Sequence, residues 1–267
     1  MSALDTIDQE YPSHSFDKPK ALRRTLITLA AVSISLLFLH YAKYTSSFYI
    51  FLSLIESTLN LPEEYFSQSL AQSQWHTLIE YAWWTSCHLL AFILIPVFVI
   101  KFLFKDAVAN FGWRWQQTHQ HWAGYCCLIL PILCFVYIAS LGTDFINHYP
   151  FYKLTHRSYL DFIFWEILYL TQFVCLEFFF RGFMLQALKP ALDANAIWII
   201  CVPYMMIHLP KLWPEATSAI LFGFFLGILA MQSRSIWGGV LVHAGIALSM
   251  DIAAMIRTNG LPTQFWP

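Results

Sequence analysis

Ionisable side chains interrupt two apolar stretches of this chain in a pattern that could support chemistry. Glu177 and Arg181 stand four residues apart, and His208 and His243 each follow a long apolar run. The four-residue spacing places an acid and a base on one helix face, where the pair can neutralise its own charge. Ionisable groups at membrane depth are costly to bury and usually mark a substrate path or a reaction site. These four residues are therefore the first candidates for function.

The composition indicates a polytopic membrane protein. The 267 residues are 58% hydrophobic and 12% charged, with a mean hydropathy of +0.55, whereas soluble domains carry roughly 25% charged residues. A net charge of −1 excludes the basic footprint of a nucleic-acid-binding protein. The six cysteines form no CxxC pair, so neither a disulfide framework nor a metal site is expected. We expect the site to need no metal and no cofactor.

Hydropathy predicts an all-α transmembrane bundle of about seven spans, each near the roughly 20 residues that cross a bilayer core. The amphipathic segment 48–61 would add an eighth if it is re-entrant rather than interfacial. The spacing of Gly223 and Gly227 favours close helix packing. The expected spans are Thr25–Ala42, Leu78–Phe104, Trp122–Leu141, Tyr159–Leu188, Ala194–Leu209, Glu215–Met231 and Ile236–Ile256.

The chain divides by composition into four parts. Residues 1–24 form a polar tail, 25–158 the N-terminal helices and loops, 159–256 a helical core with the polar candidates, and 257–267 a C-terminal tail. A cytoplasmic N-terminus puts nine lysines and arginines in inner loops and five in outer loops. By the positive-inside rule this favours N-in and C-out, and we expect a bacterial inner membrane.

Depth within the membrane connects Glu177 with His208. The two helices that carry them should form a hairpin around residues 189–193. At 1.5 Å per residue, Glu177 and His208 lie about 18 and 21 Å from that turn. Tyr204, one helical turn before His208, shares its face and could hydrogen-bond within the site. The matched depth favours a shared site over separate interhelical hydrogen bonds.

Three further polar residues could complete this site. His243 lies about 10 Å into the last helix, so Asp251 would be closer in depth to Glu177 if that helix starts where the sequence indicates. Glu215 opens the helix that follows His208. It either compensates the helix dipole or reaches the site.

Other membrane-protease motifs are absent: the chain contains no HExxH, no GxGD and no GxSG sequence. Its ordered polar motifs instead resemble the CPBP family of intramembrane glutamic proteases, which includes type II CAAX prenyl endopeptidases and bacteriocin-processing or immunity proteins. The resemblance covers roughly Tyr159–Asp251. The three motifs are Glu177-Phe-Phe-Phe-Arg181-Gly182, Tyr204-Met-Met-Ile-His208 and His243-Ala-Gly-Ile-Ala247.

The resemblance implies roles but also shows two departures. The family's first motif usually has two adjacent glutamates, the first being the general base, and this chain has Leu176 there. The third motif usually has an asparagine where this chain has Ala247. By resemblance, His208 activates water and His243 stabilises the oxyanion. Glu177 and Glu215 remain alternative sources of the missing carboxylate, with Arg181 as the ion-pair partner of Glu177.

Two hypotheses follow. The first is an intramembrane endopeptidase that cleaves a membrane-associated or lipid-anchored protein with water activated by Glu177 and His208. The second is a membrane scaffold or bacteriocin-immunity protein that retains the fold without the base. A transporter is disfavoured because the sequence shows no inverted repeat and no pair of discontinuous helices.

Overall fold

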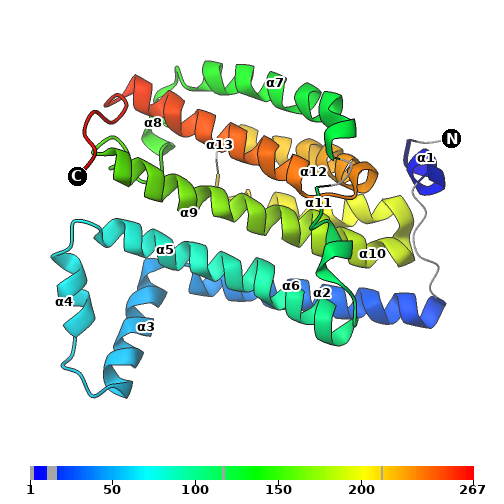
Figure 1. The fold of residues 1–267 in the computed structure, drawn as a ribbon, viewed down its shortest axis with the longest axis horizontal. Helices are drawn as coiled ribbons and strands as arrows, with labels where there is room; N and C mark the ends of the chain where they lie inside the picture. The colour runs from blue at the N-terminus through cyan, green and yellow to red at the C-terminus, as the bar shows by residue number, and fades with distance from the viewer. Residues whose placement is uncertain (1–2, 11–16, 116–117, 212) are drawn as a thin grey trace. The chain divides into compact units, whose positions relative to one another are not determined.

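The computed structural model describes residues 3–10, 17–115, 118–211 and 213–267, and these residues form helices and connecting turns without a strand (Figure 1). The predicted all-α fold is confirmed. The elements are α1 (Ala3–Glu10), α2 (Lys18–Ala42), α3 (Thr45–Thr58), α4 (Tyr65–Ala71), α5 (His76–Leu89), η1 (Leu90–Leu94), α6 (Ile95–Phe98), η2 (Val99–Leu103), η3 (Val108–Phe111), η4 (Thr118–His121), α7 (Trp122–Ala139), α8 (Thr143–His148), α9 (Tyr159–Glu177), η5 (Phe178–Met184), α10 (Leu185–Leu192), η6 (Asp193–Asn195), α11 (Ala196–Met206), α12 (Trp213–Ser233) and α13 (Trp237–Arg257).

Six helical stretches in the described chain are long and apolar enough to cross a membrane, so the protein is a multi-pass integral membrane protein. Seven spans were expected. The difference lies in Tyr159–Met206, which counts as one stretch of 48 residues. A straight helix of that length would extend about 72 Å, over twice the roughly 30 Å core. The chain turns instead at η6, where Asp193 takes φ 49°. The expected fifth span is therefore α11, which has 11 residues.

Several helix ends differ from the hydropathy boundaries. α2 begins at Lys18 rather than Thr25, because lysine and arginine can continue a helix while their charged ends reach towards water. α11 ends at Met206 rather than Leu209, so His208 lies in the following turn. Pro210 explains this end, since proline disfavours helical geometry in the residue before it. The amphipathic segment expected at residues 48–61 forms α3, Thr45–Thr58.

The described chain separates into two compact units. The first contains Met1–Ser35, Phe92–Pro131 and Phe173–His243, and the second contains Leu36–Ala91, Ile132–Gln172 and Ala244–Pro267. In the second unit, Val136, Phe145, Tyr149 and Ala254 form a buried apolar core.

Within the first unit, α11 and α12 lie side by side (Figure 1). A Cβ atom on Gly223 would stand 2.9 Å from Cδ1 of Tyr204, and one on Gly227 would stand 2.8 Å from Cγ2 of Ile197. Both glycines therefore let the two helices approach closely, as their spacing predicts. This packing holds Tyr204, and with it the second polar motif, against α12.

The polar residues of the first motif stand where α9 becomes the π-helical segment η5. Such segments insert an extra residue per turn and occur often at functional sites. The phenylalanines of η5 are fully buried. A Cβ atom on Gly182 would lie 2.6 Å from the Phe111 carbonyl oxygen, so only glycine allows this close backbone approach. The segment thus locks Arg181 into the interior of the first unit.

Candidate functional site

Glu177 and Arg181 form a fully buried ion pair. Arg181 Nη1 donates to Glu177 Oε1 at 2.8 Å, and each residue is 1% exposed. The Arg181 guanidinium carbon also lies 4.2 Å from the centre of the Tyr204 ring, a cation–π geometry. Arg181 Nη2 donates to the Gly223 carbonyl at 3.5 Å. Arg181 therefore connects η5 with both α11 and α12.

His243 joins the same carboxylate from α13. Its Nδ1 lies 3.0 Å from Glu177 Oε1, and its Nε2 lies 2.8 Å from the Tyr204 hydroxyl. Phe173 stacks on the imidazole at 5.6 Å and 10°, and Phe222 packs edge-on at 4.9 Å. The two phenylalanines fix the ring plane, so that His243 links Glu177 to Tyr204.

The Glu177 carboxylate lies directly against the backbone of α13. A Cβ atom on Gly239 would stand 2.2 Å from Glu177 Oε2, so any larger residue would displace the carboxylate. In the described residues, Oε2 of Glu177, Nε of Arg181 and Nδ1 of His243 are buried and have no hydrogen-bond partner. Buried polar atoms without partners are uncommon and often mark sites where function opposes stability.

His208 is attached to this network through Tyr204. Its Nδ1 lies 2.7 Å from the Tyr204 carbonyl oxygen, and the two ring centres are 4.6 Å apart. A carbonyl oxygen can only accept, so Nδ1 carries the proton. The neutral ring therefore has its basic nitrogen at Nε2, and a hydrogen bond of this kind fixes the tautomer. Glu177, His243, Tyr204 and His208 form one connected series.

A scan against family models matches residues 158–249 to the Rce1-like family, described as type II CAAX prenyl endopeptidase Rce1-like. These residues, about a third of the chain, are similar to the Rce1-like family. The match confirms the resemblance inferred from the three motifs, and all three motifs lie in the matched segment. No curated protein and no solved structure gives a significant match to the chain.

Two positions of the Rce1-like segment lack the polar side chains that the motifs imply. Leu176 is partly exposed and Ala247 is buried, and neither can donate or accept a side-chain hydrogen bond. The described residues contain no group of three His, Cys, Asp or Glu side chains able to hold a metal ion.

The remaining candidates have other partners. Lys211 Nζ donates to Glu215 Oε1 at 2.5 Å, and the Lys211 backbone N–H donates to the His208 carbonyl at 3.0 Å. Glu215 is thus held beside the turn that contains His208. Asp251 belongs to the second unit, where Trp165 Nε1 donates to its Oδ2 at 2.6 Å. The sequence left open whether His243 or Asp251 is the group nearer Glu177, and in the structure His243 contacts it.

Three residues that position the site were not identified from the sequence. Phe173 and Phe222 clamp the His243 ring, and Gly239 makes room for the carboxylate. Phe173 stands one turn before Glu177, and Gly239 one turn before His243. A search for residues one turn from the polar candidates would have found both, whereas Phe222 has no comparable signal.

Proposed function

We propose that the protein is an intramembrane endopeptidase that cleaves a peptide bond of a membrane-associated protein with water as the nucleophile. The observation that carries this proposal is the series Glu177–His243–Tyr204–His208 within the Rce1-like segment. It combines a histidine with an available basic nitrogen and a second histidine that lies beside a carboxylate. A lipid-anchored protein is the substrate class suggested by the family description.

His208 acts as the general base. Its proton is held on Nδ1 by the Tyr204 carbonyl, which leaves Nε2 to accept a proton as water attacks the peptide carbonyl. The same nitrogen then returns the proton to the leaving amine. A positioned acid–base group typically contributes about 10²- to 10⁴-fold in rate.

His243 and Tyr204 stabilise the tetrahedral oxyanion. When His243 is neutral and its Nε2 accepts from the Tyr204 hydroxyl, the ring proton is on Nδ1, 3.0 Å from Glu177 Oε1. If His243 takes up a proton from the solvent before the reaction, Nε2–H donates to the Tyr204 oxygen and frees the hydroxyl proton to face the oxyanion. Donors held in a water-poor site stabilise such charge strongly. Glu177, whose Oε1 is shared by Arg181 and His243, orients His243 rather than activating water.

The test is cleavage of an internally quenched, prenylated CAAX peptide by the purified full-length protein in liposomes. We expect His208→Ala to lower kcat at least about 100-fold. His40→Ala, which alters an exposed histidine outside the network, should leave turnover unchanged. Equal turnover in the wild type and His208→Ala would overturn the proposal.

A non-catalytic member of the family is the second candidate, and a specific observation favours it. Leu176 occupies the position of the usual base, and Glu177 Oε1 is already held by two partners. In this case the wild type shows no turnover, and the double variant Leu176→Glu, Ala247→Asn gains it. Measurable wild-type turnover abolished by His208→Ala would exclude this function.

The same proposal includes a cytoplasmic N-terminus in a bacterial inner membrane, supported by the distribution of lysines and arginines between the expected loops. In a variant whose six native cysteines are replaced by serine, a single cysteine introduced at Ser2 should react with a membrane-impermeant maleimide only after the cells are opened. Labelling of intact cells would contradict this orientation.

A further inference from the structure

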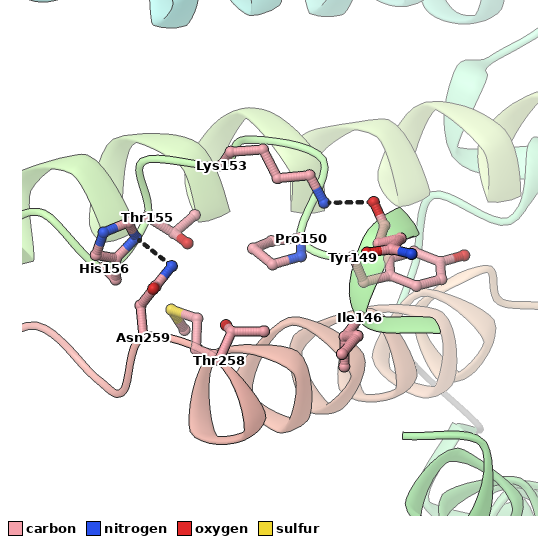
Figure 2. Close-up of a pocket in the computed structure, with 10 residues that line it drawn as sticks. Ile146, Tyr149, Pro150, Lys153, Thr155, His156, Thr258 and Asn259 are labelled. Carbon is pink, nitrogen blue, oxygen red and sulfur yellow. Dashed lines mark hydrogen bonds between the residues drawn. The ribbon is translucent and has the colours of Figure 1, made fainter. Parts of the chain in front are cut away.

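The second unit contains a cavity of 230 Å³ that the proposed reaction does not use. It lies between the loop that leads into α9 and the C-terminal end of α13 (Figure 2). Both helices belong to membrane-spanning stretches. None of its lining residues is acidic. They are Ile146, Asn147, Tyr149, Pro150, Lys153, Thr155, His156, Met255, Thr258 and Asn259.

Lys153 gives the cavity a positive charge without an ion-pair partner among the described residues. Its Nζ donates to the neutral backbone carbonyl of Asn147 at 2.8 Å (Figure 2), which leaves the ammonium two further donors. Burial lowers the pKa of Lys153, while the charge of Asp251 opposes the shift. A bound anion would favour the charged ammonium further.

The nearest acidic side chain in sequence does not compete for this lysine. Asp161 accepts from Arg157 at 2.7 and 2.8 Å and from Ser158 at 2.8 Å. The Tyr152 hydroxyl also donates to it, at 2.5 Å. Because these donors saturate the carboxylate, the charge of Lys153 stays available to a ligand.

The second observation that indicates a ligand, after the charge of Lys153, is the hydroxyl group of Thr155. The residue is fully buried, and its hydroxyl has no hydrogen-bond partner among the described residues, although it lines the cavity. Next to it, the Asn259 side-chain nitrogen lies 3.4 Å from His156 Nδ1 (Figure 2). An amide nitrogen can only donate, so the neutral His156 carries its proton on Nε2 as a further donor. The cavity thus collects donors around an unfilled space.

We propose that this cavity binds a phosphate-bearing anion, namely the phosphodiester headgroup of a membrane lipid. Lys153 and Thr155 donate to the phosphate oxygens. Ile146, Pro150 and Met255 offer an apolar wall for the glycerol carbons. The volume exceeds that of a lone phosphate, and basic pockets between transmembrane helices can bind lipid headgroups. Free phosphate shares the chemistry and is distinguished by the experiment.

The experiment titrates full-length protein in a neutral detergent with dihexanoyl phosphatidylglycerol, with inorganic phosphate and with dihexanoylglycerol, which lacks the phosphate. Isothermal calorimetry measures binding to the wild type, Lys153→Gln, Thr155→Val and the control Lys43→Gln. We expect the phosphatidylglycerol Kd to rise about tenfold or more in the two cavity variants, as loss of a charge-assisted hydrogen bond predicts. The control should match the wild type.

Thr155→Val keeps the test independent of folding. Because the hydroxyl makes no hydrogen bond in the described structure, its loss should leave the melting temperature of the ligand-free protein unchanged. Cavity-dependent binding of inorganic phosphate alone would support the anion site and assign it to free phosphate. Equal binding by all four proteins, no binding of either phosphate probe, or equal binding of dihexanoylglycerol would overturn the proposal.

Discussion

The described residues contain two acid–arginine pairs with the same four-residue spacing, one in each unit, and their surroundings differ. Asp161 receives hydrogen bonds from Arg157, Tyr152 and Ser158, and the Arg157 side chain remains 25% exposed. Glu177 has Arg181 and His243 on one oxygen, while its second oxygen and Arg181 Nε are buried without partners in the described structure.

This difference separates a structural pair from a site under constraint. A carboxylate with every lone pair engaged stabilises the local fold and has little capacity for further chemistry. A buried pair with unpaired atoms is less stable than its geometry would permit, and such sites are retained where reaction or binding requires them. The comparison therefore supports the proposed role of Glu177 and a structural role for Asp161.

The largest expected effect comes from removing each arginine. Arg181→Leu leaves Glu177 charged and fully buried, so it should lower the free energy of unfolding by about 3–5 kcal/mol. Arg157→Leu should cost about 1–3 kcal/mol, because Asp161 keeps the Tyr152 and Ser158 donors. SDS-induced unfolding in mixed micelles measures both. Equal losses would remove the distinction between the two pairs.

The second prediction concerns the space beside Glu177, which alanine substitutions at two neighbouring glycines can test. Gly238 and Gly239 are neighbours on α13, but a Cβ atom on Gly238 would meet Tyr125 Cζ at 2.1 Å, whereas one on Gly239 would meet Glu177 Oε2. Each alanine substitution should cost about 1–3 kcal/mol through overpacking. Only Gly239→Ala should also lower peptide turnover, because only it moves the carboxylate that orients His243. The same drop in turnover for Gly238→Ala would contradict this assignment.

The hydropathy and residue spacing of single segments were sufficient to predict much of the site around Glu177. Hydropathy located the membrane helices, and the four-residue spacing predicted the Glu177–Arg181 pair that the structure shows. The same spacing placed Tyr204 beside His208, and their contact runs through the Tyr204 carbonyl. These features depend on helical geometry within one segment, which the sequence determines directly.

Features that depend on how helices cross could not be predicted in this way. Counting residues from the expected start of the last helix placed Asp251 rather than His243 near the depth of Glu177. The count assumes that helices begin at the same level and run parallel, whereas tilt and loop length set their relative height. The hydroxyl bond from Tyr204 to His243 and the fit of Gly239 against Glu177 arise from the same helix crossings.

The most local changes distinguish the two polar clusters by single oxygen atoms. Tyr152 and Tyr204 are equally buried at 1% exposure, and each hydroxyl bonds one polar group. Tyr152→Phe removes a donor to a charged carboxylate and should cost about 1.5–3 kcal/mol without changing turnover. Tyr204→Phe removes the bond to His243 and should cost only about 0.5–1.5 kcal/mol. Its kcat should nevertheless fall, because the phenolic proton facing the oxyanion is lost while substrate binding is unchanged. A drop in kcat for Tyr152→Phe would contradict a purely structural role for the cluster around Asp161. An unchanged kcat for Tyr204→Phe would contradict a catalytic role for the cluster around Glu177.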